Sequence, residues 1–291
     1  MGYDLGEGWA ASMRKDLTAL GINFSVRDPN WNVDAGAQTI TSLISEKPDV
    51  IVVQNPDLNS YAKLFQRAEK AGIYVISVNM KTTVPTSAFV GADYIRIGEM
   101  EAERIVKLCG KGSGTSGKIA LVQGTITAAG NAFNMKGIEN VLSKHPEIKI
   151  VSEQAADWDA TKARNITSTV LQANQDLCGV IGMWDVMDTG TAAAVSEFNK
   201  RAKRDKPVYL ITSGAGAQFV CNNIADGTFT EAVRYDVPLQ GHDISVIIQQ
   251  LLQAKEKPGT HKISVFSRLM LVNKENLTPT SCWDTSELKK K

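Results

Sequence analysis

Three stretches of this 291-residue chain contain residue types that could carry out phosphate or acyl chemistry. The loop Gly112–Lys118 has the glycines and the lysine of a phosphate-binding loop, but Ile119 stands where that motif needs a serine or threonine for magnesium. The stretch Gly214–Gly216 has Val220 where a dinucleotide-binding loop has its third glycine. Ser213 lacks the glycine two residues earlier that a nucleophile elbow uses. The sequence therefore predicts neither a nucleotide site nor an enzyme.

The histidines and cysteines are too scattered for a metal site. No Cys-x-x-Cys pair occurs, and no histidine stands at metal-ligand spacing. An oxidising compartment would permit a disulfide such as Cys221 to Cys282, whereas buried free thiols are typical of a cytosolic protein. The four cysteines are Cys109, Cys178, Cys221 and Cys282. We expect no metal and no cofactor.

Aromatic and planar polar side chains follow the predicted strands, at the points where the strands end. Binding sites for sugars combine aromatic faces for C–H groups with planar side chains such as Asp, Asn and Arg for hydroxyl groups. Either tryptophan could instead cap the core, and Asp159 is better placed to cap a helix that begins near Thr161. In chain order the candidate residues are Asn79, Trp158, Trp184, Asp185, Ser213, Tyr235 and Asp236.

Short β-branched runs alternate with amphipathic helical patterns along the whole chain. Apolar strands that alternate with helices predict α/β architecture, with doubly wound parallel sheets covered on both faces. The opening residues lead almost directly into the helical stretch Trp9–Leu20, so we expect a missing first strand and a gap in the first sheet. The predicted strands are Ile22–Val26, Val50–Val53, Tyr74–Val78, Ile119–Val122, Ile148–Val151, Val180–Met183 and Val208–Thr212.

The charges of the chain nearly cancel, with Lys+Arg 32 against Asp+Glu 31. This balance favours a neutral ligand over nucleic acid or an anionic lipid surface. No apolar run approaches the roughly 20 residues that cross a bilayer. The N-terminus also lacks the basic and apolar segments of a signal peptide. We expect a monomer.

The order of several motifs resembles the type I periplasmic binding proteins of the ribose and galactose class. These motifs are Asp49–Val53, Ala71–Ile76, Val90–Asp93, Ala156–Asp159 and Tyr235–Gly241. The resemblance covers nearly the whole chain. It implies two doubly wound lobes joined by a three-segment hinge near Gly91–Asp93, Asp236–Val237 and Ser267–Arg268. The expected lobes are residues 1–92 plus 237–267 and residues 93–236 plus 268–291.

The resemblance also assigns ligand contacts on the first-lobe side and near the hinge. Asn79 occupies the position of a hydroxyl-binding aspartate, and Met80 replaces an arginine that is common beside it. Asn134 falls near a second family arginine, and Trp9 near the polar-aromatic loop of the first lobe. Trp31 follows another predicted strand and would add an aromatic face, with simple surface exposure as the alternative.

In the second lobe, the resemblance places Trp158 at a stacking aromatic and Trp184 at an asparagine that precedes the shared Asp185. Ser213 stands where an aspartate is usual, and Tyr235-Asp236 overlies a glutamine followed by an acidic or amide residue. The loss of two arginines and the gain of a tryptophan favour an uncharged sugar or polyol over ribose itself.

The resemblance implies the substrate-binding subunit of a bacterial ABC importer, which captures its ligand by hinge closure and delivers it to the permease subunits in the membrane. Such a protein works in the periplasm or another extracytoplasmic space. The alternative is the ligand-sensing domain of a lactose-repressor-type transcription factor that lacks its DNA-binding domain, because that domain shares the fold.

Overall fold

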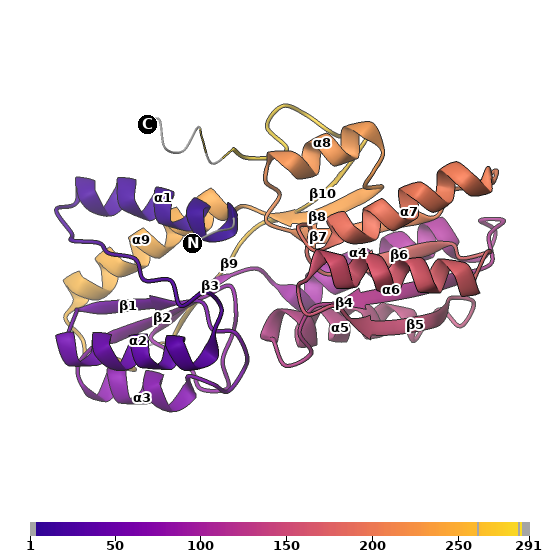
Figure 1. Ribbon diagram of the computed structural model, residues 1–291. Helices are drawn as coiled ribbons and strands as arrows, with labels where there is room; N and C mark the ends of the chain where they lie inside the picture. The colour runs from indigo at the N-terminus through magenta and orange to yellow at the C-terminus, as the bar shows by residue number, and fades with distance from the viewer. Residues whose placement is uncertain (1–3, 261, 285, 287–291) are drawn as a thin grey trace.

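The computed structural model describes residues 4–260, 262–284 and 286, which form two α/β lobes (Figure 1). The sheet of the first lobe is parallel throughout, in the order β1-β2-β3-β9. Its strands are β1 (Val50–Val53), β2 (Tyr74–Val78), β3 (Ala88–Gly91) and β9 (Ile263–Phe266). Its helices are α1 (Asp4–Ala19), α2 (Val33–Glu46), α3 (Ala62–Lys70) and α9 (Val237–Ala254).

The second lobe has a larger sheet, in the order β10-β8-β7-β6-β4-β5, with β10 antiparallel to β8 and the other pairs parallel. Its strands are β4 (Lys118–Gln123), β5 (Lys149–Ala155), β6 (Gly179–Gly182), β7 (Tyr209–Gly214), β8 (Glu231–Tyr235) and β10 (Leu269–Asn273). Its helices are α4 (Tyr94–Cys109), α5 (Ala129–Leu142), α6 (Ala160–Ala173), α7 (Asp188–Ala202) and α8 (Gln218–Asp226).

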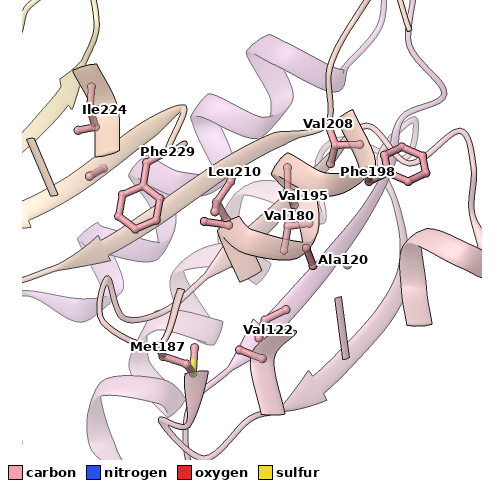
Figure 2. Close-up of a cluster of buried hydrophobic side chains, with 14 of the residues drawn as sticks. Ala120, Val122, Val180, Met187, Val195, Phe198, Val208, Leu210, Ile224 and Phe229 are labelled. Atoms are coloured by element: carbon pink, nitrogen blue, oxygen red, sulfur yellow. The ribbon is translucent and has the colours of Figure 1, made fainter. Parts of the chain in front are cut away.

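Helices cover both faces of each sheet, which explains why the strands are apolar on both sides. In β2, Ile76 packs in the cluster formed with α1 and α9, whereas Val75 packs in the cluster formed with α2 and α3. Figure 2 shows the corresponding core of the second lobe, where Val180 and Leu210 of neighbouring strands lie near Val195 of α7.

The chain crosses between the two sheets at three places: after β3, after β8, and between β9 and β10. Because of these crossings, α9 returns to pack on α1 and β10 returns to the second sheet. The molecule therefore has the two-lobed, doubly wound α/β fold with a three-segment hinge that the sequence predicts.

Ile22–Val26 is not a strand in the structure, so this prediction was wrong. A strand needs a neighbour with which to exchange backbone hydrogen bonds. Among the described residues, β1 forms one edge of the first sheet and pairs with β2 alone. A cavity separates residues 22–26 from β1, and both segments line it.

Both disulfides lie within the second lobe. Cys221 of α8 is joined to Cys282, with sulfur atoms 2.01 Å apart, which is the pairing that the sequence left open against free thiols. Cys109 at the end of α4 is joined to Cys178 just before β6. These bonds tie the C-terminal segment to α8 and the end of α4 to the sheet.

Candidate functional site

A cavity of about 640 Å³ lies at the carboxyl ends of the strands, between the lobes, and continues into the first lobe. This volume includes the part inside the first lobe as well as the part between the lobes. The second lobe contributes residues from the loops after β5 and β6 and from the end of β7, including Trp158, Trp184 and Ser213. Tyr94 and Tyr235 line it beside the hinge. The part inside the first lobe is lined mainly by apolar side chains of α1, α9 and β1.

Trp158 and Trp184 form an aromatic corner in the second-lobe wall. Their ring centroids are 6.1 Å apart, and the rings are nearly perpendicular at 86°. Both side chains are half-buried. The Trp158 ring lies against Gly124, where an added Cβ atom would be 2.1 Å from it, so only glycine leaves room for this ring position. The corner offers two apolar surfaces to the C–H groups of a ligand.

The loop that carries Trp184 contacts Asp188, whose carboxyl group is buried. The Asp188 backbone N–H donates to the Trp184 carbonyl at 2.9 Å. The Asp188 carboxyl accepts from Thr212 Oγ1 at 2.5 Å and from Thr191 Oγ1 at 3.2 Å. Burial raises the pKa of Asp188 to about 7, and these hydrogen bonds oppose the rise. Trp184 is thus held by residues of the protein core.

A second buried carboxyl group lies behind Ser213. Glu101 of α4 is fully buried and accepts from Asn134 Nδ2 at 3.0 Å. Burial raises the pKa of Glu101 to about 8, while hydrogen bonding from Asn134 opposes the rise and the nearby Asp188 charge adds to it. Ser213 therefore lies between the cavity and this buried carboxyl group.

Asp185 does not line the cavity but lies directly behind the residues that do, and it contacts the loop after β7. Its backbone N–H donates to the Ser213 carbonyl at 2.8 Å. Its carboxylate accepts from the Gly216 N–H at 3.1 Å, and it fills the space beside Gly214, where an added Cβ atom would be 2.4 Å away. In this conformation, Asp185 supports the wall formed by Ser213 and Gly214.

The structure separates the sequence-predicted residues into two groups. The residues that line the cavity are Trp9, Trp158, Trp184, Ser213 and Tyr235. Trp9 does so from α1, where its Nε1 donates to Gln240 Oε1 at 2.7 Å. The residues that do not line it are Asn79, Asn134, Asp185 and Asp236.

Asn134 and Asp236 are engaged in local contacts of other kinds. Asn134 is buried between α5 and α4, and its amide meets Glu101. Asp236 caps α9, and its carboxylate accepts from the Leu239 N–H at 3.1 Å. Neither side chain lines the cavity in this conformation, and a contact of either with the ligand stays a prediction. The expected cap at Asp159 is confirmed, since Asp159 accepts from the Lys162 N–H at 2.8 Å.

Two residues of the wall were missed by the sequence reasoning. Tyr94 lies in the first turn of α4 and reaches the cavity from the hinge. Met183 lies between the end of β6 and Trp184. Their positions just after a crossing segment and just after a strand are the signals that could have identified them.

The charged side chains of the wall are few, and two of them are paired. Arg27 lies 2.6 Å from Glu46, and Asp157 lies 3.1 Å from Lys162. Within the part of the chain that the structure describes, no cluster of His, Cys, Asp and Glu side chains could hold a metal ion. In the same ranges, no helix is both long and apolar enough to span a membrane. The wall therefore suits a small uncharged molecule.

Comparisons with known proteins give consistent matches. A family model described as a periplasmic binding protein domain matches residues 3–256. The chain is 27% identical over 221 residues to the D-apiose import binding protein of Actinobacillus succinogenes, covering 75% of this chain and 68% of that protein. It is 30% identical over 145 residues to the D-allose-binding periplasmic protein of Escherichia coli, covering 47% of this chain and 46% of the relative.

A third relative is the xylitol-binding protein of Mycolicibacterium smegmatis, 27% identical over 206 residues, with 68% of this chain and 58% of the relative covered. The matched regions thus span from about half to two thirds of these relatives. Among solved structures, a carbohydrate transporter solute binding protein from Agrobacterium Radiobacter in complex with D-arabinose superposes with a TM-score of 0.83 at 19% identity, covering 96% of this chain and 93% of that one. This likeness supports the fold.

Proposed function

The chain belongs to the periplasmic binding protein family, and from this premise we propose that it captures a neutral sugar or polyol for a bacterial ABC importer. Members of this family and the relatives above are substrate-binding transport proteins and not enzymes. The names of those relatives refer to apiose, allose and xylitol. They support an importer subunit rather than the ligand-sensing domain of a transcription factor.

The single observation that carries the proposal is the aromatic corner of Trp158 and Trp184 on the cavity wall, which Tyr94 and Tyr235 also line. Aromatic faces suit the C–H side of a sugar, and neutral hydroxyl groups suit its own hydroxyl groups. A phosphate or carboxylate ligand would need a cation. The arginine of this wall, Arg27, is already paired with Glu46.

The proposed mechanism is hinge closure. The ligand first binds to the second-lobe wall, whose aromatic corner is held by core contacts. The first lobe then rotates over it, and the exclusion of water strengthens each hydrogen bond to the ligand. The closed pair of lobes is the form that the permease subunits would recognise. The paired cysteines agree with work outside the cytoplasm, in an oxidising compartment.

A thermal-shift screen tests this proposal. Pentoses, hexoses, inositols and short polyols are added to the purified protein, after partial unfolding and refolding to remove any bound ligand. A ligand at 100 times its Kd stabilises the folded state by about 2.7 kcal/mol, so one sugar or polyol should raise Tm by several degrees.

Trp184→Phe and Trp184→Ala provide the matched controls for the screen. We expect the phenylalanine variant to keep part of the shift, because it keeps an aromatic face, and the alanine variant to lose most of it. A shift only with phosphorylated or carboxylated sugars would contradict the proposal of a neutral ligand. No shift with any sugar or polyol would contradict the proposed function.

A further inference from the structure

The side chain of Asn79 contacts residues in or directly beside all three segments that cross between the lobes, two of them directly and the third through Gln240. Its Oδ1 accepts from the Ala92 N–H at 3.0 Å, in the first crossing. Its Nδ2 donates at 3.0 Å to Oη of Tyr235, the last residue of β8 before the second crossing. Gln240 Nε2 lies 3.3 Å from Asn79 Oδ1 and donates to Ser267 Oγ in the third crossing at 2.8 Å. Asn79 is thus the centre of the hinge.

The same amide group also reaches across to the second lobe. Asn79 Nδ2 donates to Tyr94 Oη at 2.9 Å, in the first turn of α4. The rings of Tyr94 and Tyr235 form an edge-to-face pair with centroids 6.4 Å apart, and both rings line the cavity. A ligand that touches either ring would therefore contact a residue that is hydrogen-bonded to Asn79.

The backbone holds Asn79 in place for these contacts. Asn79 has φ of +58°, a left-handed conformation that asparagine tolerates better than most residues. Its N–H donates to the Val90 carbonyl at 2.8 Å. Gly91 lets the two segments approach, since an added Cβ atom there would be 2.6 Å from the Asn79 Cα. The side chain is 1% exposed, so its hydrogen bonds are made away from solvent.

We infer that Asn79 is a positioning residue that sets the angle between the lobes and couples ligand contact at Tyr94 and Tyr235 to the hinge. This inference rests on the proposed function, in which ligand binding closes the lobes. A rotation of the lobes changes the distances from Asn79 to its hydrogen-bond partners, because some of these partners belong to the second lobe. Buried polar groups are costly to leave unpaired, so the lobes favour the angle at which all these hydrogen bonds are made.

The role is tested by measuring the lobe angle in the ligand-free protein. Dyes are attached to cysteines introduced at two exposed positions, one in each lobe, by Lys63→Cys and Thr161→Cys. Single-molecule energy transfer then reports the distribution of distances between the lobes. Asn79→Gly removes the amide group and suits the positive φ, which makes it a cleaner test than alanine.

We expect Asn79→Gly to broaden the distance distribution and to weaken the affinity for the sugar found in the screen about tenfold, or about 1.4 kcal/mol. The matched control is Asn55→Ala. Asn55 is equally buried in the first lobe, but its amide donates to the carbonyls of Asp57 and Lys81, within that lobe. An unchanged distribution in Asn79→Gly, or the same broadening in Asn55→Ala, would overturn the inference.

Tyr235→Phe provides a second variant that preserves packing and removes only one partner of Asn79. It should shift the distribution in the same direction by a smaller amount, and no shift would count against the inference even if Asn79→Gly failed to fold. Because the distances are measured without ligand, a failed sugar screen would contradict the proposed function and leave the hinge result readable.

Discussion

The two lobes differ in how completely their interiors are filled. The second lobe has the larger sheet, and it contains both disulfides. The first lobe has a shorter sheet, and the cavity extends into it between residues 22–26 and β1. We therefore expect a division of roles, in which the second lobe supplies most of the preorganised binding surface.

Preorganisation has an energetic consequence for binding. A wall that is already in its binding conformation loses little conformational entropy when the ligand arrives. Trp158 and Trp184 meet this condition, because Gly124 and Asp188 fix the positions from which they project. The first lobe contributes mainly apolar surface to its side of the cavity. The comparison therefore predicts that stability and affinity are both concentrated in the second lobe.

Removal of a disulfide should have the largest effect of the predicted changes. It should lower the stability of the second lobe and leave that of the first lobe nearly unchanged. Cys109→Ala combined with Cys178→Ala opens a loop with a sequence separation of 69 residues. Chain-entropy arguments place the loss of unfolding free energy on the order of 4 kcal/mol. Urea unfolding, followed by separate fluorescent reporters in each lobe, should show an earlier transition for the second lobe.

The second disulfide provides the control for that experiment. Cys221→Ala combined with Cys282→Ala opens a loop with a separation of 61 residues, so its effect should be of similar size. If both reporters shift together in either variant, the lobes unfold as one unit, and the proposed difference in their independent stability is wrong.

The buried acids should give the second lobe a distinctive pH dependence. Burial raises the pKa of Glu101 from 4.5 to about 8 and that of Asp188 from 3.8 to about 7. The folded state keeps protons that the unfolded state releases, so this contribution is complete below pH ~4 and is lost as pH rises to ~8. Each unit of difference between the folded and unfolded pKa values corresponds to about 1.4 kcal/mol of unfolding free energy. We therefore expect the free energy of unfolding to fall by a few kcal/mol as the pH rises.

Urea unfolding at pH 5 and pH 8 measures this loss through the second-lobe reporter. Asp188→Asn removes one of the titrating groups and should reduce the difference between the two pH values. Greater stability of the wild-type second lobe at pH 8 than at pH 5 would contradict the assignment of raised pKa values to these acids.

Local patterns predicted the elements better than they predicted the contacts of single side chains. The strands β1 and β2 were identified with their observed bounds, because apolar runs between helices are visible in the sequence. The cap at Asp159 depends only on residues within one turn. Ile22–Val26 has the composition of a strand, but a strand also requires a paired neighbour, which local composition does not report.

The candidate site shows the same limit. Asn79, Asn134 and Asp236 are residue types that bind hydroxyl groups, yet their partners are the hinge, Glu101 and the first turn of α9. Those partners are distant in sequence for two of the three residues, so only the fold reveals them. Tyr94 was missed although it directly follows the expected crossing segment Gly91–Asp93, because a tyrosine at the start of a helix is not by itself typical of a ligand site.

The smallest expected effect is a change in ligand affinity when one tryptophan of each lobe is replaced. Trp184 belongs to the aromatic corner, whereas Trp31 lines the first-lobe end of the cavity and is 38% exposed. Trp184→Ala should weaken ligand affinity at least tenfold, about 1.4 kcal/mol, because it removes a preorganised face. Trp31→Ala should change affinity by less than about threefold, because Trp31 lies outside the aromatic corner and, among the described residues, its ring is not held beside a second aromatic ring. Isothermal titration with the sugar found in the screen measures both. Equal losses would mean that the first lobe supplies as much of the binding surface as the second, and that the division of roles between the lobes is wrong.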